Sequence, residues 1–226
     1  MTAPKSPKPK DNFTRYLVIG VVVLVAGIML VPTVLEKTGN TTPAAIPSTV
    51  NADNGYGITF NKELTGLPVV DIYEDFQCPI CQQFEGVNMK YIDSLITEKK
   101  AVVTFHVLSF LGEESVRAAN ASACAADEGK FLAFHNTMYA NQPKAENSGE
   151  WSAERIIAIG KVAGVTGSKF ESCVKDGTYN GWVEKVAVAG AKSGVNSTPT
   201  VFVNGKEINR NTDYFDQAKF KAAVEG

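Results

Sequence analysis

DFQCPIC, residues 75–81, joins an apolar run to a helical pattern. The apolar run, LPVVDIY at 67–73, predicts a buried strand, and the periodicity after Pro79 predicts a helix to about residue 98. Proline is favoured at the first position of a helix, so Pro79 places Cys78 at the N-cap. Unpaired N–H groups and the helix dipole at that end stabilise a thiolate. We therefore expect Cys78 to be a nucleophile.

Cys81 lies three residues after Cys78, so both side chains share one face of the predicted helix at roughly 5–6 Å. A disulfide fits that spacing, and the pair can then cycle between dithiol and disulfide. Half of a zinc site and an inert structural disulfide are the two other interpretations of C-x-x-C. A structural zinc site usually has a second close pair of ligands, whereas Cys124, Cys173 and the two histidines each stand alone in the sequence. We therefore expect no metal site.

The composition is typical of one globular domain with an N-terminal extension. The chain has 226 residues, of which 44% are hydrophobic and 20% charged. The net charge is −2, and the basic residues of the first fifteen positions offset part of a more acidic remainder. This balance gives no indication of nucleic-acid binding.

Residues 16–35, YLVIGVVVLVAGIMLVPTVL, contain no charged side chain. A helix of this length spans about 30 Å, the thickness of a bilayer core, which predicts a single transmembrane anchor in the cell membrane. A cleaved signal peptide is the alternative, because residues 43–45 (PAA) resemble a weak cleavage site. The basic tail, residues 1–15, should stay in the cytoplasm and the rest should be extracytoplasmic. Residues 36–55, rich in Thr, Asn, Pro and Gly, predict a flexible linker.

The folded domain is expected to span residues 56–226. Its first half predicts a β-α-β unit, followed by four or five short helices at about 113–192. The remaining expected elements are a short strand at 57–60, strands at 67–73 and 101–110, a strand at 200–203, a hairpin turn at Asn204-Gly205 with a return strand at 206–208, and a closing helix at 214–224.

This order of elements resembles the DsbA-like thiol-disulfide oxidoreductases, specifically the membrane-anchored or exported forms of actinobacteria. The resemblance rests on DFQCPIC, on ACAADEGKF at 123–131 with His135, and on GVNSTPTVFVNG at 194–205. It implies an α/β, thioredoxin-like fold with an inserted helical subdomain. It also implies that Cys78 is the attacking thiol, that Cys81 is the resolving thiol, and that Pro199 is a cis-proline facing both.

A cis Thr198–Pro199 bond would free the Thr198 backbone to pair with an extended peptide beside Cys78. Thr198 and Pro199 are therefore expected to bind substrate. Three further residues are expected to support the motif, namely Phe76, Pro79 and Ile80. The strongest oxidants of the family have His where this chain has Ile80, and Ile cannot donate a hydrogen bond to the thiolate. A milder oxidant is expected.

Related proteins often carry an acid six residues before the first cysteine, as a proton relay beneath the thiols. This chain has Ile72 there, and the two-residue period of a strand turns Asp71 and Tyr73 to the other face. Glu74 and Asp75 are the remaining candidates for the relay.

Cys124 and Cys173 are the only cysteines left, and in an oxidising compartment they are expected to form a structural disulfide. His106 and His135 are expected to be packed structural residues rather than metal ligands.

The resemblance implies an enzyme that oxidises the thiols of exported proteins through a Cys78–Cys81 disulfide. Its implied partners are exported proteins with free cysteines and a quinone-linked membrane reoxidant of the DsbB or vitamin-K-epoxide-reductase type, without an organic cofactor. A reductase or isomerase with the same site stays an alternative, because the direction depends on the reduction potential. A non-catalytic binding module is the second alternative.

Overall fold

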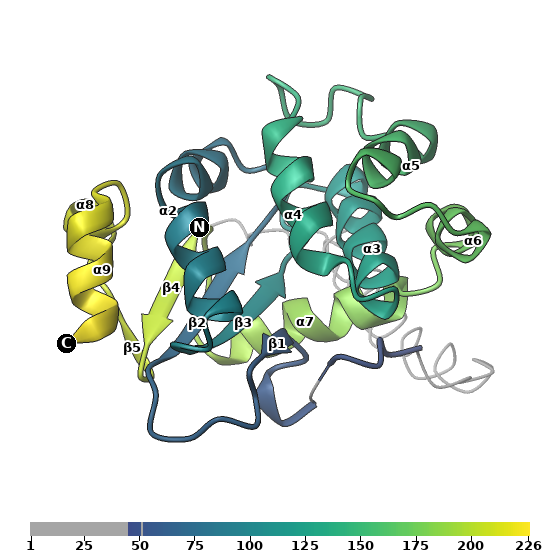
Figure 1. Ribbon diagram of the computed structural model, residues 1–226. Coiled ribbons are helices and arrows are strands. Elements are labelled where there is room, and N and C mark those ends of the chain that lie inside the picture. Colours follow the sequence, from purple (N-terminus) through teal and green to yellow (C-terminus); the bar gives the residue numbers. More distant parts are fainter. Residues whose placement is uncertain (1–44, 51) are drawn as a thin grey trace, which may run out of the picture. The chain divides into compact units, whose positions relative to one another are not determined.

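A five-stranded mixed sheet forms the centre of this computed structural model, which describes residues 45–50 and 52–226 (Figure 1). The strand order is β1-β3-β2-β4-β5. The parallel pair is β2 with β3, and the other neighbours are antiparallel. The bounds are β1 Ile58–Phe60, β2 Val69–Glu74, β3 Val102–Val107, β4 Thr200–Val203 and β5 Lys206–Glu207.

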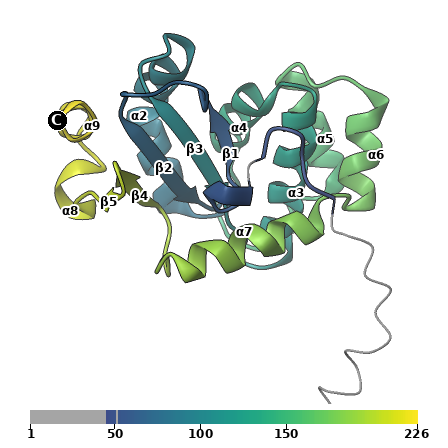
Figure 2. The ribbon, with the colours of Figure 1, turned by 90° about the horizontal axis from the view of Figure 1, so that it is seen from below.

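Helices cover both faces of this sheet. One face packs against α2 (Pro79–Thr97) and the other against α7 (Asn180–Lys192), as Figure 2 shows. Next to α2 lies α9 (Gln217–Glu225), preceded by the short α8 (Arg210–Asp213). The other helices gather on the side of the sheet away from α8 and α9, namely α3 Glu113–Asp127, α4 Phe131–Ala140, α5 Ala153–Val162 and α6 Ser168–Asp176.

The predicted α/β architecture with inserted helices is confirmed. Five helices fill residues 113–192, as expected, but the last of them, α7, packs on the sheet and so belongs to the sheet layers. Asn204 and Gly205 both have positive φ, 48° and 76°, the geometry of a tight hairpin turn, and they join β4 to β5.

The expected closing helix at 214–224 begins later than predicted. Asp216 is its N-cap, and its carboxylate accepts hydrogen bonds from the N–H groups of Ala218 and Lys219 at 3.0 and 3.2 Å. Tyr214 is buried before that cap, and its hydroxyl accepts a hydrogen bond from the N–H of Val201 in β4 at 2.7 Å. The helical periodicity of the sequence does not reveal this contact with the sheet.

The transmembrane anchor expected at 16–35 and the basic tail expected at 1–15 lie outside the described residues. Among residues 45–50 and 52–226, no helix has the length and apolar character needed to cross a bilayer. The described part of the expected linker, residues 45–50 and 52–55, packs on the domain. Ser48 donates two hydrogen bonds to Asp127 Oδ1 at 3.1 and 3.3 Å, so the packed chain begins before the expected boundary at residue 56.

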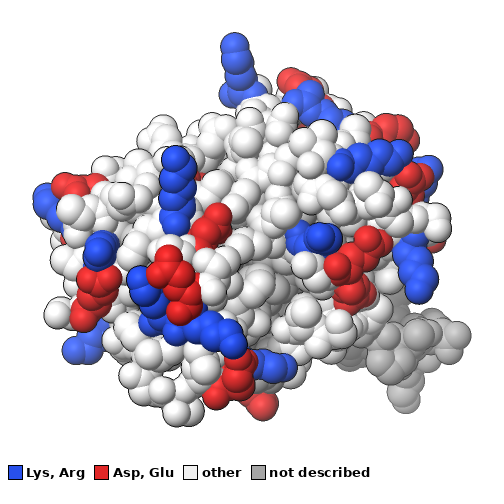
Figure 3. Space-filling view, viewed as in Figure 1, with Lys and Arg blue, Asp and Glu red and all other residues white. Residues whose placement is uncertain are grey.

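The predicted Cys124–Cys173 disulfide is present and joins α3 to α6, with 6.0 Å between the two Cα atoms. It lies among the inserted helices, whose small alanine side chains allow α3 to be almost entirely buried. On the face viewed in Figure 3, acidic and basic side chains are interspersed between large uncharged areas.

Candidate active site

Cys78 and Cys81 lie at the start of α2, directly after the loop that follows β2. Cys78 is the N-cap, Pro79 is the first residue of the helix, and both cysteines are free thiols. Cys78 is 8% exposed, whereas Cys81 is completely buried. Only Cys78 can meet a substrate sulfur without a rearrangement of the core, which agrees with its expected role as the attacking thiol.

The two thiols differ strongly in acidity. The pKa of Cys78 is lowered to about 6, first by a hydrogen bond from the Cys81 thiol, while burial opposes the shift. The Thr198 side chain and the backbone N–H groups of Cys81 and Ile80 lower it further. Burial raises the pKa of Cys81 well above its ordinary value, and its hydrogen bond to Cys78 adds to that shift. Cys78 is therefore a thiolate at neutral pH and Cys81 a thiol.

Thr198 and Pro199 lie beside Cys78, in the loop before β4. The Thr198–Pro199 peptide bond is cis, as expected. When Cys78 is protonated, its thiol donates to the carbonyl oxygen of Thr198 at 3.5 Å, although the two residues are 120 positions apart in the sequence. The structure therefore brings together the four residues expected to form the reaction site.

A family model described as thioredoxin matches residues 65–225. The chain belongs to the thioredoxin family. The solved structure of MdbA, a thiol-disulfide oxidoreductase from Actinomyces oris, has a TM-score of 0.69 and 28% identity, covering 84% of this chain and 93% of that one. Disulfide bond formation protein D of Bacillus subtilis is 29% identical over 160 residues, which are 68% of this chain and 70% of that protein. The DsbA-like resemblance is thus confirmed.

Serine/threonine-protein kinase PknE of Mycobacterium tuberculosis is also similar, at 25% identity over 147 residues. These residues are 59% of this chain but only 26% of the kinase. The chain therefore spans about a quarter of the length of this kinase.

The residues expected to support the motif of this thioredoxin-family site have different environments. Phe76 is 1% exposed, and its ring packs against those of Tyr139 and His135. Ile80 is 42% exposed, so its side chain contributes little to packing, and only its backbone N–H acts on the Cys78 thiolate. Phe76 is thus a core residue, whereas position 80 is open to substitution.

A loop between α4 and α5, residues 141–152, holds the chain next to Cys78. The Gln142 side-chain amide donates to the carbonyl oxygens of Phe76 and Cys78 at 2.6 and 3.1 Å. Gln77 accepts a hydrogen bond from the Asn147 N–H at 2.7 Å. Sequence patterns did not reveal these contacts, because a polar loop residue carries no signal of its distant partner.

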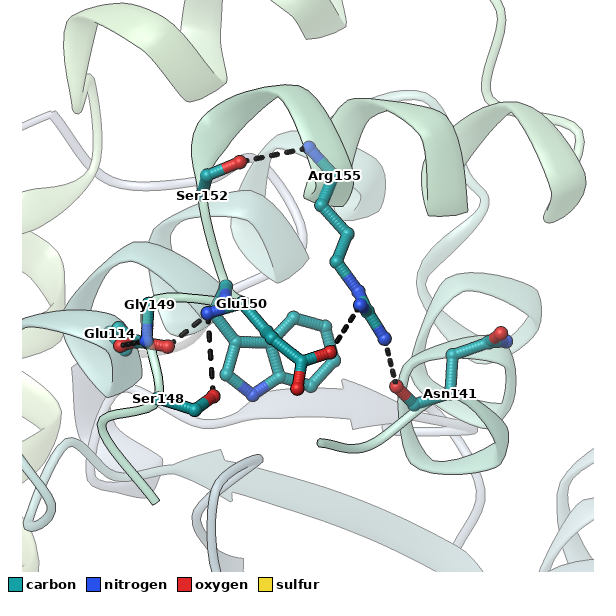
Figure 4. Close-up of polar contacts among 8 residues, drawn as sticks. Glu114, Asn141, Ser148, Gly149, Glu150, Ser152 and Arg155 are labelled. Atoms are coloured by element: carbon teal, nitrogen blue, oxygen red, sulfur yellow. Dashed lines mark hydrogen bonds and ion pairs between the residues drawn. The ribbon is translucent and has the colours of Figure 1, made fainter. Parts of the chain in front are cut away.

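This loop is itself anchored, as Figure 4 shows. Glu114 on α3 accepts hydrogen bonds from the N–H groups of Gly149 and Trp151 at 2.7 and 3.0 Å. Arg155 on α5 pairs with Glu150 at 2.5 Å and donates to the carbonyl oxygen of Asn141 at 3.3 Å. The inserted helices therefore fix the position of the reactive segment through this loop.

Asp75 is a buried acid close to the thiols, as the sequence allowed. Its carboxylate accepts hydrogen bonds from Ser115 at 2.6 Å and from the N–H of Gln77 at 2.9 Å. Burial raises the pKa of Asp75 to about 6, although these hydrogen bonds oppose the shift. Asp71 points elsewhere, as predicted, and pairs with His106 at 3.3 Å.

Glu74, Glu85 and His135 form a buried cluster that the sequence analysis missed. His135 packs among aromatic rings, as expected, but its Nε2 also lies 2.7 Å from Glu74 Oε1. The available signal was an acid at position 85, four residues after Cys81 and therefore on the same buried face of the helix.

Proposed function

We propose that this protein is a membrane-anchored, extracytoplasmic thiol-disulfide oxidoreductase that oxidises exported proteins. The observation that carries the proposal is the difference in acidity between the Cys78 and Cys81 thiols at the start of α2. A stabilised Cys78 thiolate favours the reduced enzyme, and a disulfide whose reduced form is stabilised is an oxidant. The likeness to MdbA, a thiol-disulfide oxidoreductase, supports the same activity.

The reaction consumes the Cys78–Cys81 disulfide. A substrate thiolate attacks Cys78 Sγ, so a mixed disulfide forms and Cys81 leaves as a thiolate that takes up a proton. A second substrate thiolate then attacks the substrate sulfur of the mixed disulfide and releases the Cys78 thiolate, which leaves readily because its pKa is about 6. The substrate loses two electrons to the enzyme, which becomes a dithiol.

Thr198 is placed to orient the substrate chain during this exchange. Its carbonyl oxygen lies 3.5 Å from Cys78 Sγ, so an extended peptide that pairs with this backbone would bring its own cysteine to Sγ. Reoxidation needs an electron acceptor, for which we propose a quinone-linked membrane protein of the DsbB or vitamin-K-epoxide-reductase type. The uncharged stretch at 16–35, with basic residues before it, supports the membrane location.

The test is to trap the mixed disulfide with the full-length chain. Cys81→Ser keeps the Cys78 nucleophile and removes the thiol that would release a bound substrate. Non-reducing gels of cells should therefore show disulfide-linked adducts with exported proteins, and a reducing agent should cleave them. The matched control is the double variant Cys78→Ser/Cys81→Ser, which should form none. Equal adducts in both variants, or none in either, would show that Cys78 does not exchange disulfides and would favour a binding module.

The redox state of Cys78 and Cys81 in cells tests the direction of electron flow. An oxidase should be found mainly with the Cys78–Cys81 disulfide intact when cellular thiols are trapped in acid and then labelled. A chain found mainly as the dithiol would instead indicate a reductase or isomerase. Labelling of Cys78 by a thiol reagent that does not cross membranes, in intact cells, tests the extracytoplasmic location.

A further inference from the structure

Three buried ionisable side chains from three elements meet one helical turn from Cys81. Glu74 ends β2, Glu85 lies on α2 and His135 on α4, and none is more than 1% exposed. One carboxylate oxygen of each glutamate and one ring nitrogen of His135 all lie within 4.8 Å of one another. This cluster takes no part in the exchange reaction described above.

Three of the four carboxylate oxygens of this cluster lack a protein donor among the described residues. Glu74 Oε2 and both oxygens of Glu85 are buried and have no hydrogen-bond partner among the described residues. Buried carboxylates without partners are strongly unfavourable, so this cluster must hold either protons or a cation. A cation placed where one oxygen of each glutamate and one ring nitrogen of His135 converge can contact all three ligand atoms at once.

The surroundings of His135 orient its ring toward the carboxylates. Its Nδ1 lies 2.8 Å from Asn136 Oδ1, and the Asn136 amide nitrogen donates to Asp93 Oδ2 at 2.8 Å. Because Asp93 can only accept from that nitrogen, the amide oxygen must face His135, and Nδ1 carries a proton. Nε2 then faces Glu74. A second-shell hydrogen bond of this kind is typical of histidines that bind metal ions.

A surface pocket lies beside the residues that orient His135. Asp93 and Asn136 line a surface pocket of about 570 Å³. The rings of Phe105, Phe131 and Tyr139 also surround His135, at 4.8, 5.5 and 5.0 Å from its ring. An ion that entered past Asn136 would thus reach a site shielded from water.

We propose that Glu74, Glu85 and His135 bind one divalent transition-metal ion of the Zn²⁺ or Mn²⁺ type. One imidazole nitrogen with carboxylate oxygens suits these ions, whereas Ca²⁺ takes six to eight oxygen ligands. The charge of +2 balances the two carboxylates. Metal–ligand distances of about 2.0–2.2 Å require the three groups to rearrange around a common centre, because His135 Nε2 and Glu74 Oε1 lie 2.7 Å apart without an ion. The site is independent of the direction of electron flow.

Protons are the competing occupants of this cluster. Without a cation, burial raises the pKa of Glu85 to about 8. Burial alone would lower the pKa of His135, but the adjacent Glu74 carboxylate outweighs it and raises this pKa to about 9. The experiment must therefore distinguish a bound ion from bound protons.

The experiment uses the full-length chain with the Cys78–Cys81 disulfide formed, so that these thiols cannot bind metal. After treatment with a chelator, Zn²⁺ or Mn²⁺ alone is added, and bound metal and melting temperature are measured. We expect one ion per chain and a rise in melting temperature of about 5–10 °C at a concentration of about 100 Kd. Ca²⁺ at the same concentration should give no shift.

Two variants and one matched control locate the ion. Glu85→Gln and His135→Gln should abolish both uptake and the shift. His106→Gln should retain both, because His106 is the other buried histidine, pairs with Asp71 at 3.3 Å and lies outside the cluster. If the variants do not fold, the Mn²⁺-loaded wild-type protein should still show coupling of the electron spin to one imidazole nitrogen.

The proposal is overturned if the wild-type protein takes up no stoichiometric ion and its melting temperature does not depend on metal. Protons would then balance the charge of the buried carboxylates. Uptake that disappears equally in His106→Gln and His135→Gln, or Mn²⁺ without a nitrogen ligand, would overturn it as well.

Discussion

At the scale of single residues, the chemistry depends on two thiols that are three positions apart. The folded state lowers the pKa of Cys78 from 9.0 to about 6, so this group stabilises the reduced protein. The contribution is complete above about pH 9 and is lost as the pH falls through about 6. The unfolding free energy of the reduced form, compared with that of Cys78→Ser, should therefore increase between pH 6 and 9.

Ile80→His tests how this thiolate is stabilised. Position 80 is 42% exposed, so the substitution should not disturb packing, and a protonated imidazole can donate a hydrogen bond to Cys78. A charge-assisted bond contributes about 1.5–3 kcal/mol, which raises the reduction potential by roughly 30–60 mV and lowers the pKa of Cys78. The glutathione redox equilibrium and thiolate absorbance against pH measure both quantities.

Ile80→Gln is the control, because it has similar size and no charge. An unchanged potential and pKa in Ile80→His would mean that a side chain at position 80 does not reach Cys78, and that the backbone N–H groups and Cys81 act alone.

At the scale of elements, the sequence predicted the helix starts and turns that depend on neighbouring residues alone. Pro79 predicted the start of α2, and Asn204-Gly205 predicted the β4–β5 hairpin, because each depends on neighbouring backbone geometry. The predicted start of the closing helix, residue 214, was wrong, because Tyr214 bonds to strand β4 instead of beginning α9. The reactive cysteines followed from a motif, whereas the Glu74–Glu85–His135 cluster depends on contacts between three elements.

The loop at 141–152 should affect both stability and exchange rate. Gln142→Leu removes two hydrogen bonds, to the carbonyl oxygens of Phe76 and Cys78, and should lower the unfolding free energy by about 1–2 kcal/mol. It should also slow oxidation of a model dithiol peptide, since Cys78 is held less firmly. Denaturant titration and stopped-flow kinetics measure these effects.

Gln83→Leu is the matched control, because Gln83 is an exposed glutamine on α2. Equal losses in both variants would mean that the Gln142 contacts do not position Cys78.

At the scale of the whole molecule, the structural disulfide and the redox-active cysteines lie on different helices of the described chain. The Cys124–Cys173 disulfide joins α3 to α6 across a sequence separation of 49 residues, while Cys78 and Cys81 lie on α2. Cys124 lies nine residues after Ser115, the α3 residue that hydrogen-bonds Asp75, so a change in the first disulfide should leave the second largely unaffected.

Cys124→Ala/Cys173→Ala should therefore separate the two properties. Loss of a cross-link over about 50 residues should lower the unfolding free energy by about 4 kcal/mol in the chain-entropy model. The reduction potential of Cys78–Cys81 should change by less than about 10 mV, a small fraction of the 30 mV that corresponds to 1.4 kcal/mol. A large shift in potential would show that the inserted helices tune the thiols directly.

The unequal exposure of the two thiols, 8% for Cys78 and none for Cys81, also has a consequence for oxidative damage. Peroxide should reach Cys78 first and form a sulfenic acid there. The adjacent Cys81 thiol can then condense with it, releasing water and forming the Cys78–Cys81 disulfide, which is the oxidised state in the proposed exchange reaction. Mass spectrometry after peroxide treatment should show this disulfide in the wild type and sulfinic acid at Cys78 in Cys81→Ser. Oxidation that in an isolated cysteine would continue to the irreversible sulfinic acid would here stop at the Cys78–Cys81 disulfide.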